Sequence, residues 1–352
     1  MNHISFKSFA LLLGLLIVVI DPARAQADLK PPLAGLIAMG NITFHRHDDG
    51  VADNSLKDIY AKPGILDGIV INIAWSQIES KPYAVTTKAI DQALAQVRAY
   101  NKKYPQHPLG VRLRIFAGPN APDWVKHLGG KPVDIQYRGE SLTIGRFWHP
   151  RYIKAWRDLQ EQLAKKYDAD PLINEVAMTS CSTVTSEPFI FAGGKVSLKH
   201  MHAAGFSDGH YRRCLMRADD DYIYWQKTRI EYPFNSFRPS DSGQPHSLAP
   251  HVTIKAMRQW RKKLGPVGVI STHTLHKPKY HEAIPIDDAI KKMGPPIEFQ
   301  VESPKDVNME AAIRYGISLK ATAIEIWPDT VKNTSSKKLK QWSADIKRNQ
   351  AQ

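Results

Sequence analysis

The sequence contains few cysteines and, beyond its first twenty residues, no long hydrophobic run. Two cysteines in 352 residues exclude a fold that depends on a disulfide framework, and also a zinc site made of cysteines alone. No later segment is apolar enough to cross a bilayer, since a spanning helix needs about 20 such residues. The hydrophobic share of 43% and the charged share of 23% are instead typical of a globular protein.

Acidic residues are outnumbered by basic ones, 34 against 48, which gives a formal net charge of +14. The lysines and arginines are scattered over helix-like segments such as 255–263 and 337–348, and no basic run is interleaved with aromatic residues. A nucleic-acid-binding surface has that interleaved pattern. We therefore expect a solvated basic surface and no nucleic-acid partner.

The first 25 residues have the three parts of a secretory signal peptide. Lys7 supplies the positive charge, Phe9–Ile20 is a short apolar run, and Ala23-Arg24-Ala25 is a small-residue cleavage site. Because the apolar run is too short to span a bilayer, a membrane anchor is the weaker interpretation. We expect cleavage after Ala25 and a mature protein, residues 26–352, that is periplasmic or secreted and has no integral membrane segment.

Export makes a disulfide possible between the two cysteines, Cys181 and Cys214. A bridge that closes a loop of this length stabilises a fold by about 3–4 kcal/mol in the chain-entropy account. Two buried thiols are the alternative, and we favour the bridge.

Short β-rich runs alternate with amphipathic helical stretches along the mature chain. The eight runs are Leu33–Met39, Gly68–Trp75, Gly110–Ala117, Ile173–Ser180, Thr228–Phe234, Val267–Thr272, Ile297–Glu302 and Ala321–Trp327. Helical spacing of apolar residues falls between them, in Lys88–Tyr104, Tyr152–Tyr167, Val252–Leu264, Asp287–Met293, Met309–Leu319 and Leu339–Lys347.

Eight strands, most of them followed by a helix, predict an α/β protein with a (β/α)8 TIM barrel in a single domain. A doubly wound open sheet is disfavoured because no glycine-rich phosphate loop follows the first strand. The predicted barrel carries one long insert, residues 181–227, after strand four.

Polar and aromatic side chains lie on or just after the predicted strands. The active site of a TIM barrel is at the carboxyl ends of its strands, so these side chains are expected to gather at one mouth. Amides and histidine can bind sugar hydroxyls, and tryptophan faces can stack on sugar rings. The expected substrate-binding residues are Asn72, Trp75, Trp124, Asn235, His273, Gln300 and Trp327.

Two carboxyl groups are placed for glycosidic cleavage, Glu187 after strand four and Glu302 after strand seven. This chemistry needs one carboxyl group that donates a proton and one that is ionised. Strands four and seven lie on opposite sides of a barrel, so the two side chains can face each other. Glu325 is the spare candidate. A buried ion-pair layer is the more ordinary role for Glu298 or Glu325, with Arg112 or Arg114 as the partner.

Several of these segments resemble the clan A glycoside hydrolases. Ile71–Glu79 is similar to their strand-two region, Gly118–Trp124 to their strand-three ending, and Ser186-Glu187-Pro188 to the Asn-Glu-Pro that carries their acid/base residue. Glu302 matches their nucleophile position and Trp327 their platform tryptophan. The resemblance implies a retaining glycosidase that acts on a polysaccharide or oligosaccharide without a cofactor, with Glu187 as acid/base and Glu302 as nucleophile.

Two other functions stay open. His45 and His47 after strand one form a His-x-His pair, which with His273 and Asp329 would suit a metal-dependent amidohydrolase-like enzyme. The glycosidase interpretation needs no metal site. A barrel that binds glycans without cleaving them would keep the tryptophans and need neither glutamate.

Overall fold

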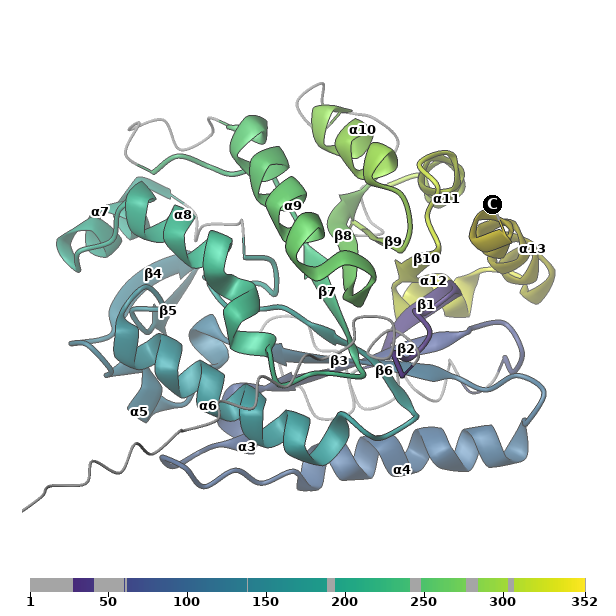
Figure 1. The fold of residues 1–352 in the computed structure, drawn as a ribbon, viewed down its shortest axis with the longest axis horizontal. Coiled ribbons are helices and arrows are strands. Elements are labelled where there is room, and N and C mark those ends of the chain that lie inside the picture. Colours follow the sequence, from purple (N-terminus) through teal and green to yellow (C-terminus); the bar gives the residue numbers. More distant parts are fainter. Residues whose placement is uncertain are drawn as a thin grey trace, which may run out of the picture.

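The computed structural model describes residues 28–40, 60, 62–137, 139–188, 194–240, 248–276, 284–302 and 307–351. In these residues eight parallel strands close into a barrel, which confirms the predicted fold (Figure 1). They pair around the ring in the order β1-β10-β9-β8-β7-β6-β3-β2. Their bounds are β1 (Gly35–Gly40), β2 (Gly68–Ala74), β3 (Gly110–Phe116), β6 (Ile173–Ala177), β7 (Arg229–Pro233), β8 (Gly268–Leu275), β9 (Ile297–Val301) and β10 (Ala323–Ile326). Each strand falls on one of the eight runs expected from the sequence.

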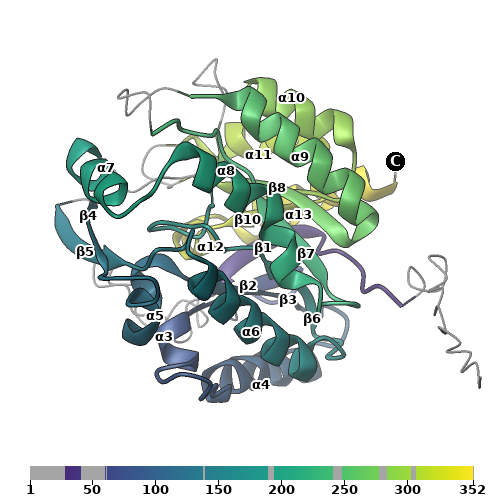
Figure 2. The same ribbon diagram turned by 60° about the vertical axis from the view of Figure 1, so that its left-hand side comes forward.

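Helices surround the barrel on its outside (Figure 2). The longer ones are α4 (Lys88–Lys103), α6 (Pro150–Tyr167), α9 (Pro250–Leu264), α10 (Ile284–Met293), α11 (Met309–Ser318) and α13 (Ser336–Lys347). Short turns of helix, α3 (Trp75–Ile78), α5 (Asp123–Lys126) and α12 (Pro328–Asn333), follow strand ends. Helix α6 begins two residues before its predicted start. Pro150 suits the first helical position, and the His149 ring accepts a hydrogen bond from the backbone of Arg151.

The alternation of side chains along each strand separates the lumen of the barrel from its outer face. Ile69, Ile71 and Ile73 of β2 belong to the large hydrophobic core between strands and helices. Val70 packs instead in a small cluster with residues of β1 and β10. Because Asn72 has the same parity as Val70, it points into the lumen, as the sequence led us to expect.

The sequence did not predict an antiparallel hairpin between β3 and α6. Its strands are β4 (Val133–Tyr137) and β5 (Glu140–Ile144), joined at Gly139 with φ +85°. The predicted insert after strand four contributes α7 (Gly194–Ala203), α8 (Asp208–Arg217) and the 3-10 turn η2 (Ala218–Tyr222). Helix α7 packs on the hairpin, where Ser197 accepts a hydrogen bond from the Gln136 backbone.

The last helix returns to the first strand. Helix α13 lies beside β1 at the C-terminal end of the described chain (Figure 1). Ser343 of α13 donates a hydrogen bond of 2.6 Å to Asp67, just before β2. Gly35 begins β1 at φ +77°, and a side chain there would collide with Asp67 and Ser343. Helix α13, the start of β1 and the residue before β2 are thus tightly packed against one another.

Candidate active site

The lumen of the barrel contains a buried network of charges. Arg112 of β3 forms ion pairs with Glu175 at 2.7 Å and Glu325 at 3.2 Å, and it also contacts Glu298. Arg114, two residues further along β3, makes two hydrogen bonds to Glu325, of 3.0 and 2.6 Å. This confirms the ion-pair layer predicted for these arginines. The carboxylates hold the pKa of Arg112 above its usual value although burial opposes the shift.

His273 of β8 connects this network to the predicted acid/base residue. Its Nδ1 lies 2.8 Å from Glu187 Oε1, and its Nε2 lies 3.2 Å from Glu231 Oε1. The side chains of His273 and Glu231 are almost completely buried, and that of Glu187 is one-tenth exposed. The imidazole therefore lies between two carboxyl groups inside the mouth of the barrel.

The protonation states follow from these contacts. Burial alone would raise the pKa of Glu187, but the hydrogen bond and the charge of His273 outweigh it and lower the pKa to about 2. Burial and Arg114 would lower the pKa of His273, but Glu187 and Glu231 raise it above its ordinary value. Burial likewise opposes the ionisation of Glu231, while Arg112 and His273 lower its pKa. The resting site thus favours ionised glutamates around a charged imidazole.

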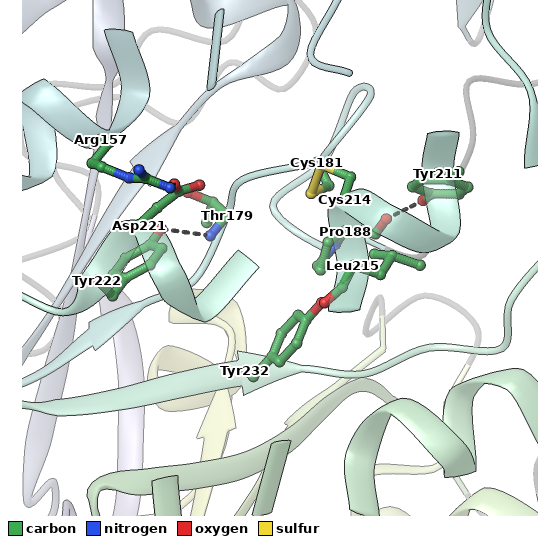
Figure 3. Close-up of a disulfide and its surroundings, with 10 residues drawn as sticks. All are labelled: Arg157, Thr179, Cys181, Pro188, Tyr211, Cys214, Leu215, Asp221, Tyr222 and Tyr232. Atoms are coloured by element: carbon green, nitrogen blue, oxygen red, sulfur yellow. Dashed lines mark hydrogen bonds and ion pairs between the residues drawn. A yellow bond between two sulfur atoms is a disulfide. The ribbon is translucent and has the colours of Figure 1, made fainter. Parts of the chain in front are cut away.

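The first part of the insert, which carries Glu187, is held in place by contacts with α8 and with the end of β3. Cys181 and Cys214 form the expected disulfide, which ties this segment to α8 (Figure 3). The Tyr211 hydroxyl donates a hydrogen bond to the Pro188 carbonyl, directly after Glu187. Gly118 at the end of β3 approaches so closely that a Cβ there would lie 2.1 Å from the Thr183 carbonyl oxygen. These contacts fix the backbone on both sides of the carboxyl group.

The end of the insert also contacts helix α6 and the chain just after β6. Arg157 of α6 forms an ion pair of 3.2 Å with Asp221 of η2 (Figure 3). The Tyr222 hydroxyl accepts a hydrogen bond of 3.0 Å from the Thr179 backbone, just after β6. Burial raises the pKa of Asp221 to about 7, although Arg157 opposes the shift.

Glu302 lies directly after β9 and is more open to solvent. Its side chain is 45% exposed, and its Oε2 lies 3.9 Å from Nε2 of His276. Its backbone N–H donates to the Leu275 carbonyl at the end of β8. Glu298 and Gln300 contact Arg112 and Arg114 in the lumen, so the parity of β9 directs Glu302 to the same side, closer to the mouth.

The predicted amide ligands are buried at the same mouth. The Gln300 Oε1 accepts from Arg114 at 3.4 Å, and Asn72 occupies the register position opposite Arg114 on β2. The Asn235 Oδ1 accepts hydrogen bonds from Thr272 and Thr274, whereas its Nδ2 is buried without a partner in the described part of the chain. Asn235 thus retains a donor for a ligand.

The tryptophans divide into two groups. Trp327 packs beside the small lumen cluster, remains partly exposed, and donates from its indole nitrogen to the Val301 carbonyl. Trp75 is completely buried outside the barrel, against Trp156 and Tyr152 of α6, and its indole N–H donates to Glu79. A sugar ring has no face of Trp75 to stack on, which corrects the substrate-binding role that we assigned to it.

Trp124 belongs to the same outer cluster as Trp75. It is partly exposed, its ring meets the edge of Trp75 at a centroid distance of 6.4 Å, and its indole N–H donates to the Glu79 carbonyl. A contact between Trp124 and a ligand remains a prediction.

The remaining predictions on this region concern metal and membrane. His45 and His47 lie outside the described residues, so their pairing stays a prediction. Within the described ranges, no group of three or more histidine, cysteine, aspartate or glutamate side chains is arranged to hold a metal ion. No helix in these ranges is long and apolar enough to cross a membrane.

Two glutamates that the sequence interpretation did not assign to the site belong to it. Glu231 of β7 contacts His273, and Glu175 of β6 is a partner of Arg112. The signal for Glu231 was present in the strand itself. Ile230 and Tyr232 beside it are apolar and face outward, so the residue between them faces the lumen.

No protein-family model matches this sequence, and no curated protein matches it either. Among solved structures, the chain resembles the catalytic domain of beta-amylase from Paenibacillus polymyxa, with a TM-score of 0.55 and 10% identity over 89% of this chain and 98% of that one. It also resembles endo-glycoceramidase II from Rhodococcus sp. in complex with a cellobiose-like imidazole, with a TM-score of 0.50 and 13% identity over 84% of this chain and 73% of that one. These likenesses show that the chain shares the barrel fold of these enzymes.

Proposed function

We propose that this protein is a glycoside hydrolase that acts on a polysaccharide or oligosaccharide, with Glu187 as acid/base and Glu302 as nucleophile. The observation that carries the proposal is that Glu187, in the loop beyond β6, and Glu302, directly after β9, belong to a lumen lined with arginine, amide and imidazole groups. The barrel likeness to a beta-amylase and an endo-glycoceramidase supports it.

The two carboxyl groups have different environments, as the retaining mechanism requires. Glu302 is half exposed and can reach the anomeric carbon of a sugar in the mouth. Glu187 is buried and held by His273, which can share a proton with it. Trp327 supplies a partly exposed ring, and the Nδ2 of Asn235, which has no partner among the described residues, supplies a donor for a sugar hydroxyl. Both groups suit a carbohydrate better than an apolar ligand.

Sugar release from a broad panel of polysaccharides, oligosaccharides and aryl glycosides tests this proposal. We expect Glu302→Gln to lose at least about a thousandfold in rate, or about 4 kcal/mol of transition-state stabilisation. The matched control is Glu161→Gln on the outer face of α6, where the carboxylate forms an ion pair with Lys165.

The stereochemistry of the first product, followed by proton NMR, tests the mechanism separately. Retention at the anomeric carbon is expected from a nucleophilic Glu302, and inversion would exclude that role. Binding of a glycan without release of sugar by the wild type would instead favour a barrel that binds carbohydrate without cleaving it.

We also propose that the protein acts outside the cytoplasm, after removal of residues 1–25. The disulfide between Cys181 and Cys214 supports this, because such bridges persist in oxidising compartments. N-terminal sequencing of the protein recovered from its native host tests it, with Gln26 expected as the first residue.

A further inference from the structure

The two ring nitrogens of His273 both face carboxylate oxygens. A neutral imidazole has one donor and one acceptor nitrogen, so it would direct a lone pair at one of the two carboxylates. Only the doubly protonated ring can donate to Glu187 and to Glu231 at once. The geometry therefore favours an imidazolium that bridges two glutamates.

The charges around the ring support this assignment. Arg114 Nη2 lies 3.4 Å from Nε2 and opposes a positive ring, but two hydrogen bonds to Glu325 already compensate its charge. Glu231 is closer to Nε2, at 3.2 Å, and is completely buried. Gln300, which accepts a hydrogen bond from Arg114, is uncharged. Two carboxylates therefore face the imidazole against one arginine that has its own partner.

This arrangement leaves the predicted acid without its proton in the resting site. A general acid must carry a proton when the leaving oxygen needs it, yet Glu187 is an ionised carboxylate beside a charged histidine. The proton on Nδ1 faces Oε1, with 2.8 Å between the two heavy atoms.

We propose that His273 stores the proton that Glu187 delivers to the leaving group, and that Glu231 holds the ring charged and in position for this transfer. The inference rests on the proposed glycosidase function. It makes His273 and Glu231 positioning residues that act through Glu187, and it assigns a role to a pair of residues that the two-carboxyl mechanism does not itself require.

In the first half Nδ1 passes its proton to Oε1 of Glu187. As the glycosidic bond breaks, its electron pair goes to the leaving oxygen, which takes this proton from Glu187, so that the carboxyl group is ionised again. A carboxylate oxygen of Glu302 forms the bond to the anomeric carbon. His273 is then neutral and still donates from Nε2 to Glu231. In the second half a water gives its proton through Glu187 back to Nδ1, and its oxygen displaces Glu302.

Nitrogen-15 NMR of histidine-labelled wild-type protein tests the stored proton without any activity measurement. We expect both ring nitrogens of His273 to stay protonated at pH 7, and the ring to become neutral at lower pH in Glu231→Gln than in the wild type. A ring that is neutral at pH 7, protonated on Nδ1 alone and accepting from Arg114, would overturn the inference and leave the glycosidase proposal intact.

The pH profile of kcat/KM on an active substrate is the second test. The active form keeps one proton on the Glu187–His273 pair, so activity falls as the pH rises through the pKa of that pair. Removing the charge of Glu231 lowers this pKa, and we expect Glu231→Gln to move the basic limb down by about one pH unit or more. A lower rate with an unmoved limb would assign Glu231 a structural role only.

Leaving-group dependence separates the proton from the rest of the chemistry. We expect His273→Gln to lose about a hundredfold or more at neutral pH on alkyl glycosides, and little on dinitrophenyl glycosides, whose leaving group needs no proton. His127→Gln, an exposed histidine on the outside of the barrel, is the control. Equal losses on both substrates would overturn the inference, whereas a wild type inactive on every substrate would overturn the proposed function itself.

Discussion

At the residue scale, the arginine in the middle of β3 is surrounded by carboxylates of other strands. Arg112 is 1% exposed and contacts Glu175, Glu298 and Glu325, with Glu231 at 4.0 Å. A buried pair of charges stabilises a fold little compared with well-packed apolar groups, but removal of one partner leaves the other charge uncompensated. Loss of Arg112 should therefore cost more free energy of unfolding than the ion pairs themselves contribute, because it leaves the buried glutamates without a compensating charge.

Replacement of this arginine tests that dependence. We expect Arg112→Met to lower the free energy of unfolding by about 3–5 kcal/mol, measured by urea denaturation at pH 7. The control is Arg98→Met. Arg98 is half exposed and forms an ion pair with Asp170, so this substitution should lower the free energy of unfolding by less than about 1 kcal/mol. Equal effects of the two substitutions would show that the lumen is open to water.

The contact between Glu187 and His273 predicts a dependence of stability on pH. The pKa of Glu187 is about 2 in the folded protein, against an ordinary 4.5, so its stabilising contribution is present above about pH 4.5 and is lost as the pH falls towards 2. This difference corresponds to about 3 kcal/mol. Unfolding measured between pH 7 and pH 3 should show a smaller loss in Glu187→Gln than in the wild type, and parallel curves would contradict the assignment.

At the scale of elements, the insert after β6 determines where the carboxyl group of Glu187 lies in the candidate active site. Glu187 lies ten positions beyond the last residue of β6, too far for the strand itself to orient it. The disulfide to α8, the Tyr211 hydrogen bond and the close approach of Gly118 perform that task. The position of the carboxyl group thus depends on elements that are distant in sequence.

Loss of the disulfide should therefore affect catalysis as well as stability. We expect Cys181→Ser with Cys214→Ser to lower the free energy of unfolding by about 3–4 kcal/mol. If the bridge positions Glu187, kcat should fall more than KM rises, because small displacements of a catalytic group reduce the rate strongly. The check is kinetics on folded protein at low temperature, with the reduced wild type as the comparison. Unchanged kcat would limit the bridge to stability.

At the scale of the whole molecule, the apolar strand runs were enough to predict the barrel. Strands such as Gly68–Ala74 and Gly110–Phe116 are buried on both faces. Eight such strands in alternation with helices are compatible with few folds other than a barrel. The hairpin β4–β5 was missed because its strands are less buried than those of the barrel, with the second and fourth residues of β4 exposed. Its signal was the alternation in Val133–Tyr137 before Gly139.

The site was predicted in part, and its errors have a local cause. Glu187 and His273, both predicted for the site, come together, and Arg114 joins Glu325 in the predicted ion-pair layer. Asn72 and Trp75 were both placed at the mouth, but they have opposite parity on β2, and the chain turns into α3 at Trp75 itself. The charged bridge through Glu231 needed the three-dimensional register, because two different strands and a loop supply its members.

The C-terminal helix is expected to be essential for the whole fold. Leu339, Trp342 and Ile346 of α13 are buried against the barrel, and burial of each large apolar side chain contributes about 1.5–3 kcal/mol. Deletion of residues 336–352 should therefore leave the protein insoluble or unfolded at 25 °C, as judged by circular dichroism and solubility. Deletion of 350–352 is the control, because it keeps Asn349 and its hydrogen bonds to Ile317 and Ala321.

The closure of the ring between β1 and β10 also constrains the order of folding. β1 is the first barrel strand to be synthesised, yet its second neighbour, β10, is made nearly three hundred residues later. Until then one edge of β1 has no partner strand, and such edges promote aggregation. Pairing between distant parts of a chain is also slow. A ribosome-bound chain that ends before residue 323 should therefore need a chaperone, and the barrel should become resistant to protease only after its last strand has been released.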